Sequence, residues 1–472
     1  MAICKFLAAK TSASVAAAAM LIFTPLAATF AADPITAVPA PAAGTPMVNS
    51  PQNICFEGGF SGSKVTAQRR MADCSEALQS RKLLPADVAL ARLYRGAARM
   101  KLGDTVMASA DYVEALKHYD GAIDPRNPDA LELYRRAAAL DALGQTDRAL
   151  GDYSEAIRLD PKDPLAFLGR GVLFAGRQRL YERAIDDFDK VLVLAPNNVD
   201  GLMHRGDAYS QMGKFGPALA DLDRAVALAP DNAEAYVYRG LANSRRNENS
   251  LAMFDYKAGL ALDPDNVDAL VNLAAIYSTS GEQTLAIADL DAAIALKKDA
   301  PLAFYNRGYA HFANRQYDLA AADYSSAIAL DPNMGLAYTN RCLIRTIVGK
   351  DLVAALGDCD KALKLMPNNT DVRETRAFVY LKMGDAEIAI REFNASLAIK
   401  PDQALSLYGR GLARIKAGHA REGAADKASA GTRSRHRPAV LRVRAGVGPK
   451  GTRTHSYTLL IHTAAVQFRS VI

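Results

Sequence analysis

The sequence predicts an all-α protein built as a linear array of antiparallel helix pairs. Three observations predict this fold class: a composition that is half hydrophobic, rich in alanine and free of tryptophan, prolines that recur about every 34 residues, and small residues at two fixed positions between them. At 472 residues the chain also exceeds the usual size of a single-core domain, so a repeat array or several domains is expected.

The repeat is marked by prolines that close phrases similar to Leu-Asp-Pro, at successive spacings of 35, 34, 34, 68, 35 and 34 residues. These prolines are Pro161, Pro196, Pro230, Pro264, Pro332, Pro367 and Pro401. The doubled gap is filled by Lys298 in the same frame. Proline cannot donate the next helical hydrogen bond and restricts the residue before it, so each one is expected to end the second helix of a pair.

Two further positions repeat in the frame that the prolines set. Position 8 holds a small residue, namely Gly96, Ala137, Gly171, Gly206, Gly240, Ala274, Gly308, Cys342, Ala377 and Gly411. Position 20 is nearly always alanine, and position 24 is large: Tyr112, Tyr153, Phe188, Leu222, Tyr256, Leu290, Tyr324 and Phe393, with Cys359 and Lys427 as the exceptions. Small residues at positions 8 and 20 allow two helices to approach closely, and the large residue fills the wedge beside them.

This pattern resembles the tetratricopeptide repeat (TPR), over about ten units in residues 89–426. The resemblance implies an all-α TPR solenoid, that is, a right-handed superhelix of antiparallel helix pairs with a concave inner surface. Each pair needs its neighbours, because one hairpin alone cannot bury its apolar face.

Two opposite charges recur together in the same frame. Position 7, usually leucine in the family, is Arg95, Arg136, Arg170, Arg205, Arg239, Arg307, Arg341, Arg376 and Arg410. Position 23 is Asp111, Asp152, Asp187, Asp221, Asp255, Asp289, Asp323, Asp358, Glu392 and Asp426. They predict a structural ladder of arginine–carboxylate pairs, broken where Leu273 faces Asp289; the alternative makes some of the arginines ligands for anions.

The N-terminal region predicts export. Residues 1–32 carry Lys5 and Lys10 and then an apolar run from Val15 to Ala28, as in a secretory signal peptide cleaved near Thr29-Phe30-Ala31. The alternative is an uncleaved anchor, although the run is short for a membrane span. Residues 33–52 are rich in proline and alanine and predict a linker, followed by an N-terminal helical segment at 53–88. We therefore expect a periplasmic or secreted protein with no membrane span after removal of the signal.

Cys55, Cys74, Cys342 and Cys359 remain after signal removal, in a compartment expected to be oxidising. Cys55 and Cys74 bracket the N-terminal segment and could tie it to the first helix. Cys342 and Cys359 replace the small and large residues that should nearly touch within one helix pair. We therefore predict two disulfides, Cys55–Cys74 and Cys342–Cys359, with buried free thiols as the alternative.

The last residues, 427–472, lose the repeat frame and become basic. They hold nine of the 57 lysines and arginines and no acidic residue, which leaves 48 basic against 51 acidic residues elsewhere. We interpret this segment as a disordered tail or the product of a frameshift. The alternative is a basic arm for anionic lipid or nucleic acid, and export argues against nucleic acid.

In the TPR family the inner groove is lined by first-helix positions 2, 5, 9, 12 and 13. In units four to six these positions form a polar and acidic stretch: Asp200, Asp207, Ser210, Glu234, Ser244, Asp268 and Ser278. In the later units they are apolar, and the predicted partner-binding residues are Tyr305, Tyr309, Phe312, Leu343, Ile347, Phe378 and Leu381, continued by Tyr408 and Leu412. We expect these aromatics to be exposed on the concave wall, where such clusters are typical anchors for a peptide or partner helix; the alternative is that neighbouring helices cover them.

The sequence shows none of the motifs of an enzyme. It lacks a Gly-x-Ser-x-Gly elbow, a phosphate-binding loop and a His-Glu-x-x-His pair, and its seven histidines are scattered. We therefore predict a protein without catalytic residues, cofactor or metal, which binds a protein or peptide on its concave face in the cell envelope. The alternative is a structural envelope component associated with peptidoglycan or an outer-membrane complex.

Overall fold

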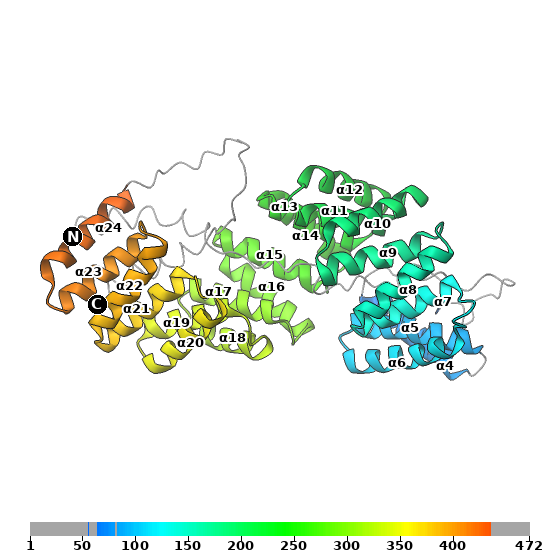
Figure 1. Cartoon of the computed structure of the whole chain (residues 1–472), viewed down its shortest axis with the longest axis horizontal. Helices are drawn as coiled ribbons and strands as arrows, with labels where there is room; N and C mark the ends of the chain where they lie inside the picture. The colour runs from blue at the N-terminus through cyan, green and yellow to red at the C-terminus, as the bar shows by residue number, and fades with distance from the viewer. Residues whose placement is uncertain (1–54, 56–63, 81–82, 436–472) are drawn as a thin grey trace. The chain divides into compact units, whose positions relative to one another are not determined.

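A computed structural model describes Cys55, residues 64–80 and residues 83–435 (Figure 1). The predicted signal peptide and linker lie outside these residues. The chain divides into two compact parts at Leu273 and Ala274, within α15 (Val267–Ser280). We refer to the described residues up to 273 as the N-terminal part, and to residues 274–435 as the C-terminal part.

The N-terminal part consists of successive helices joined by short turns. They are α4 (Lys64–Gln79), α5 (Pro85–Lys101), α6 (Thr105–Ala122), α7 (Ala130–Ala142), α8 (Thr146–Leu159), α9 (Pro164–Leu173), α10 (Tyr181–Leu194), α11 (Val199–Gln211), α12 (Phe215–Leu228), α13 (Ala233–Arg245) and α14 (Asn249–Leu262). Each first helix packs on its second helix, from α5 with α6 to α13 with α14. First helices of adjacent pairs also pack together, α7 on α9 and α11 on α13.

The C-terminal part continues the same alternation. Its helices are α16 (Gln283–Leu296), α17 (Pro301–Ala313), α18 (Tyr317–Leu330), α19 (Gly335–Val348), α20 (Leu352–Leu365), α21 (Thr370–Met383), α22 (Ala386–Ile399), α23 (Ala404–Lys416) and α24 (Ala420–Arg435). Here α19 packs on α21 and α21 on α23. The described residues contain no β-strand, which confirms the all-α solenoid of helix pairs.

Local sequence explains where these helices begin and turn. Asn198 caps α11 by accepting a hydrogen bond from the backbone of Gly201, and Asn232 caps α13 in the same way. Gly213, in the turn between α11 and α12, has a φ of +73°, a left-handed conformation that glycine adopts without strain. Each first helix is therefore reversed tightly onto its second helix.

The small residue at position 8 is required by close contact within each pair. A Cβ atom added to Gly171 would lie 2.7 Å from Cε1 of Phe188, and one added to Gly240 would lie 2.8 Å from Cε1 of Tyr256. The Cβ at Gly206 would also come within 3.1 Å of the backbone oxygen of Ala218, at position 20. The predicted packing of positions 8, 20 and 24 is confirmed.

An extra residue in the third unit is absorbed as a π-helical turn. The unit has one more residue between Gly171 and Ala184 than the next unit has between its equivalent positions. The structure places the π-helix η2 (Phe174–Gln178) at the end of α9, followed by Arg179 in the left-handed region. The second helix, α10, therefore still begins in frame.

The final described helix continues past the predicted end of the array. The composition changes at Lys427, but α24 runs on to Arg435, so the change does not end the helix. Residues 436–472 lie outside the described residues. Within the described part of the chain, no helix has both the length and the apolar character needed to cross a membrane.

Candidate protein-binding surface

All nine predicted arginine–carboxylate pairs form, each between the two helices of one unit. Most are bidentate: Arg205 donates from Nε and Nη2 to the two oxygens of Asp221 at 2.8 and 2.7 Å, and Arg307 contacts Asp323 at 2.9 and 2.7 Å. The other pairs are Arg95–Asp111, Arg136–Asp152, Arg170–Asp187, Arg239–Asp255, Arg341–Asp358, Arg376–Glu392 and Arg410–Asp426. Hydrogen bonding to Asp221 raises the pKa of Arg205, so its charge is permanent.

Each of these arginines makes a second contact that the sequence analysis missed. For eight of them, Nη1 donates to the side chain sixteen residues earlier, on the preceding helix pair; for Arg95 it donates to Ser75 of α4, twenty residues earlier. These acceptors are Ser75, Asp120, Ser154, Asp189, Asp223, Asp291, Ser325, Asp360 and Asn394. The signal was present in the sequence, since eight of the nine acceptors are Asp, Ser or Asn sixteen residues before their arginine. The arginines therefore cross-link successive units, and the chain's own acceptors occupy their donors, which favours the structural interpretation.

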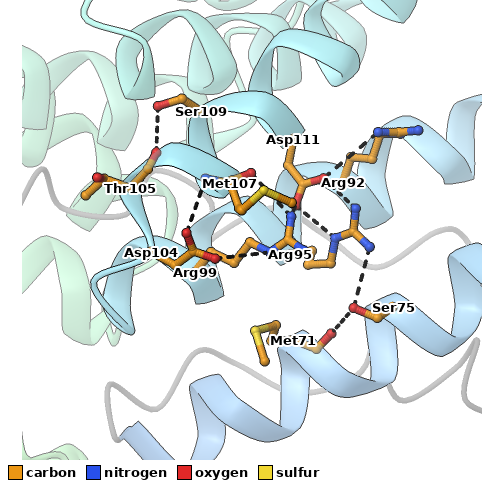
Figure 2. Close-up of polar contacts among 10 residues, drawn as sticks. All are labelled: Met71, Ser75, Arg92, Arg95, Arg99, Asp104, Thr105, Met107, Ser109 and Asp111. Carbon is orange, nitrogen blue, oxygen red and sulfur yellow. Dashed lines mark hydrogen bonds and ion pairs between the residues drawn. The ribbon is translucent and has the colours of Figure 1, made fainter.

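The first unit surrounds one carboxylate with three arginines (Figure 2). Arg95 and Arg99 donate to Asp111, Arg99 at 2.6 Å, and Nη1 of Arg92 lies 4.0 Å from it. Asp111 is buried on α6, whereas the arginines reach it from α5. On the far side, Arg95 also contacts Ser75 of α4, so this cluster fastens α4 to the first helix pair.

The four predicted cysteines form the two predicted pairs. The Sγ atoms are 2.13 Å apart in Cys55–Cys74 and 2.17 Å apart in Cys342–Cys359. All four residues are fully buried. The second bridge joins α19 to α20 at positions 8 and 24, where other units place glycine against an aromatic ring. The disulfide therefore replaces that packing contact with a covalent one.

The predicted aromatic anchors are not exposed. Tyr305, Tyr309, Phe312, Leu343, Phe378 and Leu381 are each at most 8% exposed, and Ile347 is partly buried. The expectation of an exposed aromatic wall is therefore wrong for six of the seven residues, and the alternative of covered side chains holds. Whether they contact a partner stays a prediction.

The covering has a structural cause. The ring of Tyr305 packs on Tyr324 with centroids 5.6 Å apart, and Asn340 from the next helix pair donates to both hydroxyls at 3.2 Å. Phe378 meets Phe393 edge to face at 5.0 Å. Inner-face positions in this part thus also contact the large residue at position 24 and the next first helix, which buries them.

The polar inner-face stretch in the N-terminal part remains partly accessible. Arg245 donates to Asp207 at 2.6 Å and to Ser210 at 3.1 Å. Nζ of Lys101 lies 3.2 Å from Glu234, 133 residues away in sequence, and both side chains are about one-quarter exposed. We call Lys101, Asp200, Asp207, Glu234 and Arg245 the polar wall.

The carboxylates of the polar wall lie close enough to influence the pKa of a buried tyrosine, Tyr238, and of a partly buried histidine, His204. Burial raises the pKa of Tyr238, and the carboxylates of Asp207, Glu234, Asp200 and Asp268 raise it further. Burial likewise raises the pKa of Asp200 to about 6, with a contribution from Glu234, and lowers the pKa of His204, whose ring stacks on Phe188. This wall therefore carries more negative than positive charge and can bind cationic or hydrogen-bonding groups.

Two serines of the predicted polar stretch are buried: Ser244 in the N-terminal part and Ser278 in the C-terminal part.

Across the described ranges, no group of three or more His, Cys, Asp or Glu side chains has an arrangement that could hold a metal ion.

Comparison with known proteins identifies the repeat. Tetratricopeptide repeat family models match residues 134–199, 173–243, 267–299 and 301–334. Among curated proteins, the chain is 32% identical over 98 residues to small glutamine-rich tetratricopeptide repeat-containing protein 2 of Mycosarcoma maydis, which is 20% of this chain and 27% of that protein. It is 34% identical over 105 residues to the wheat (Triticum aestivum) Hsp70-Hsp90 organizing protein, which is 21% of this chain and 18% of that protein. The chain thus spans about a quarter or less of these relatives.

Solved structures give weaker likenesses. A tetratricopeptide repeat protein from Parabacteroides merdae is 19% identical, with a TM-score of 0.40, over 53% of this chain and 95% of that chain. The APC/C hetero-tetramer Cut9-Hcn1 is 16% identical, with a TM-score of 0.45, over 80% and 88%. The identification rests instead on the family models and on the helix pairs. Residues 134–243, 267–299 and 301–334 of this chain are tetratricopeptide repeats.

Proposed function

We propose that this protein is a non-catalytic scaffold that binds a protein partner on the inner face of its repeats, in the cell envelope after export. The observation that carries the proposal is the polar wall, where charged side chains on first helices of several units remain partly accessible. Interfaces use such groups to fix the orientation of a partner and to exclude wrong ones. The repeats hold these groups at fixed spacing on rigid helices, which preorganises the surface.

Three further observations support parts of the proposal. The two disulfides are of the kind that persists in an oxidising compartment outside the cytosol. The sequence of residues 1–32 has the layout of a signal peptide, which would direct the chain to such a compartment. The wheat protein that is 34% identical to this chain over 105 residues is named for organizing two other proteins, Hsp70 and Hsp90. A scaffold needs no reaction chemistry, so neither cofactor nor metal is part of the proposal.

The test compares two matched variants of the full chain as bait in envelope extract. Asp200→Asn with Glu234→Gln removes two charges from the polar wall, and Glu182→Gln with Asp186→Asn removes two exposed charges from α10. We expect a discrete protein, identified by mass spectrometry, to bind the wild type and the α10 variant and to be depleted at least about tenfold by the polar-wall variant. Equal recovery with both variants contradicts the proposal. Cosedimentation with purified cell wall in place of a protein partner favours a structural envelope role.

A further inference from the structure

Two carboxyl groups are buried between α21 and α23, in the part of the inner face that is otherwise apolar. Glu374 is 1% exposed and Asp371 is 5% exposed. They occupy positions 5 and 2 of the ninth unit, where the other later units mostly have aromatic or aliphatic residues. Charged side chains are rarely buried this deeply without a counter-ion.

The partners of Glu374 are neutral. Ser406 of α23 donates to its Oε2 at 2.5 Å, and Nε2 of Gln403, at the start of α23, donates to the same oxygen at 3.0 Å. Gln403 also donates to Asp371 at 3.2 Å. These hydrogen bonds connect α21 to α23 through side chains that carry no positive charge.

The charged groups near Glu374 do not neutralise it. Asp371 on its own helix repels its ionised form, and Lys400 at the end of α22 attracts it without forming an ion pair. The helices α19 and α20, which also pack on α21, contribute none of these groups. Burial is the largest influence and raises the pKa of Glu374 to about 8. The protonated form is therefore the one that fits this interface.

Glu374 lies on the same face of α21 as two predicted anchors. Phe378 and Leu381 follow it by four and seven residues, so all three share one stripe of the helix. Phe378 and Leu381 belong to a hydrophobic cluster with Ala413 of α23. Separation of α21 from α23 would therefore uncover them.

We propose that the contact between α21 and α23 is a proton-controlled joint, closed when Glu374 is protonated and opened by its ionisation, which makes Phe378 and Leu381 available to an apolar segment of a partner. This inference rests on the proposed function of the inner face. An ionised Glu374 in the closed joint would be desolvated beside Asp371, whereas in the open joint water solvates it.

The direction of the pH dependence follows from proton linkage. In the closed joint Glu374 holds its proton up to a pH of about 8, whereas once exposed it releases the proton near its ordinary pKa of about 4.5. Opening therefore releases a proton, and the opening equilibrium constant rises about tenfold per pH unit between these two values. The joint is tightest at acidic pH and loosens as the pH approaches 8.

Hydrogen exchange of the full-length, oxidised protein tests this joint. We expect the protection factors of α21 and α23, corrected for intrinsic exchange, to fall about tenfold per pH unit from pH 5.5 to 7.5, while α17 keeps its protection. Glu374→Gln keeps the shape and the hydrogen-bond acceptor, so its protection should lose most of the pH dependence; what remains comes from Asp371, whose own pKa is also raised by burial. Glu387→Gln, on an exposed residue of α22, is the matched control and should behave as the wild type.

A second variant keeps the test decisive if Glu374→Gln does not fold. Asp371→Asn removes the neighbouring charge that adds to the effect of burial on the pKa of Glu374, so the loss of protection should level off at a lower pH. Protection of α21 and α23 that does not change with pH in the wild type overturns the joint, and so does an equal loss in Glu374→Gln. A partner that binds the polar wall equally at pH 5.5 and 8 would then leave the proposed function standing without the joint.

Discussion

The inner faces of the two parts differ in the groups that contact their carboxyl side chains. In the N-terminal part, Glu234 and Asp207 are paired with Lys101 and Arg245, and the pairs remain partly open to water. In the C-terminal part, Glu374 is held by neutral donors within an aromatic and aliphatic core. The same repeat frame thus supports a charged surface in one region and a protonated carboxyl in the other. The presence of a cation within hydrogen-bonding distance accounts for the difference.

Loss of a ladder arginine should have the largest effect, and the same effect in both parts. Arg205→Ala or Arg307→Ala leaves a buried aspartate without its counter-ion and removes the link to the preceding unit, at a cost of about 3 kcal/mol in the free energy of unfolding. This lies at the low end for buried pairs, because each arginine side chain is 22% exposed. Urea denaturation measures it. A cost under about 0.5 kcal/mol in one part alone would show that the ladder itself differs between the parts.

Arg245→Met should make the surroundings of Asp207 resemble those of Glu374, with no cation within hydrogen-bonding distance. Asp207 would then be a buried carboxylate near Asp200 and Glu234 with no cation, and we expect a loss of about 2 kcal/mol in the free energy of unfolding. Asp207→Asn in the same background should recover part of that loss, which a double-mutant cycle measures. Purely additive effects of the two changes would contradict the pairing.

Asp200→Asn should stabilise the protein, but only above a certain pH. The folded-state pKa of Asp200, about 6, lies above the ordinary value of 3.8, so its protonation contributes stability that is lost as the pH rises from 3.8 through 6. Asparagine removes this dependence. The difference between these two pKa values corresponds to at most about 3 kcal/mol, and because Asp200 is only partly buried we expect a gain of about 1 kcal/mol at pH 8 and close to none at pH 4. Denaturation at the two pH values checks this, and an equal gain at both would contradict the assignment.

Lys101→Met should have the smallest effect on stability. Its pair with Glu234 is partly exposed, and such pairs are worth about 0.5 kcal/mol, less at high salt. Thermal denaturation at low and high ionic strength measures this. A loss above about 2 kcal/mol in the free energy of unfolding would show that the pair of Lys101 and Glu234 is a major source of stability for the N-terminal part, and not a weak surface ion pair.

The fold was predictable because its determinants are local and repeated. The contact of Gly171 with Phe188 or of Gly240 with Tyr256 recurs at a similar spacing in successive units, so each unit independently predicts the same antiparallel helix pair. The arginine ladder and the Cys342–Cys359 bridge followed from the same frame, because both join positions that face each other within one helix pair.

The candidate site was less predictable because it depends on contacts between units. Periodicity places Tyr305 and Phe378 on the inner face, but the covering by Asn340 and by α23 arises from neighbouring pairs. The pairing of Lys101 with Glu234 spans 133 residues, which no local pattern indicates. Glu374 could have been noticed as an acidic residue in an apolar stretch, although its burial could not.

The most direct test of the scaffold is photo-cross-linking from the inner and outer faces. A photoreactive phenylalanine analogue replaces Glu234 on the polar wall in one protein and the exposed Glu182 on α10 in another, and each is irradiated in cells. We expect a discrete cross-linked partner from position 234 and none from position 182. The same adducts from both positions, or adducts from position 182 alone, would contradict capture on the inner face.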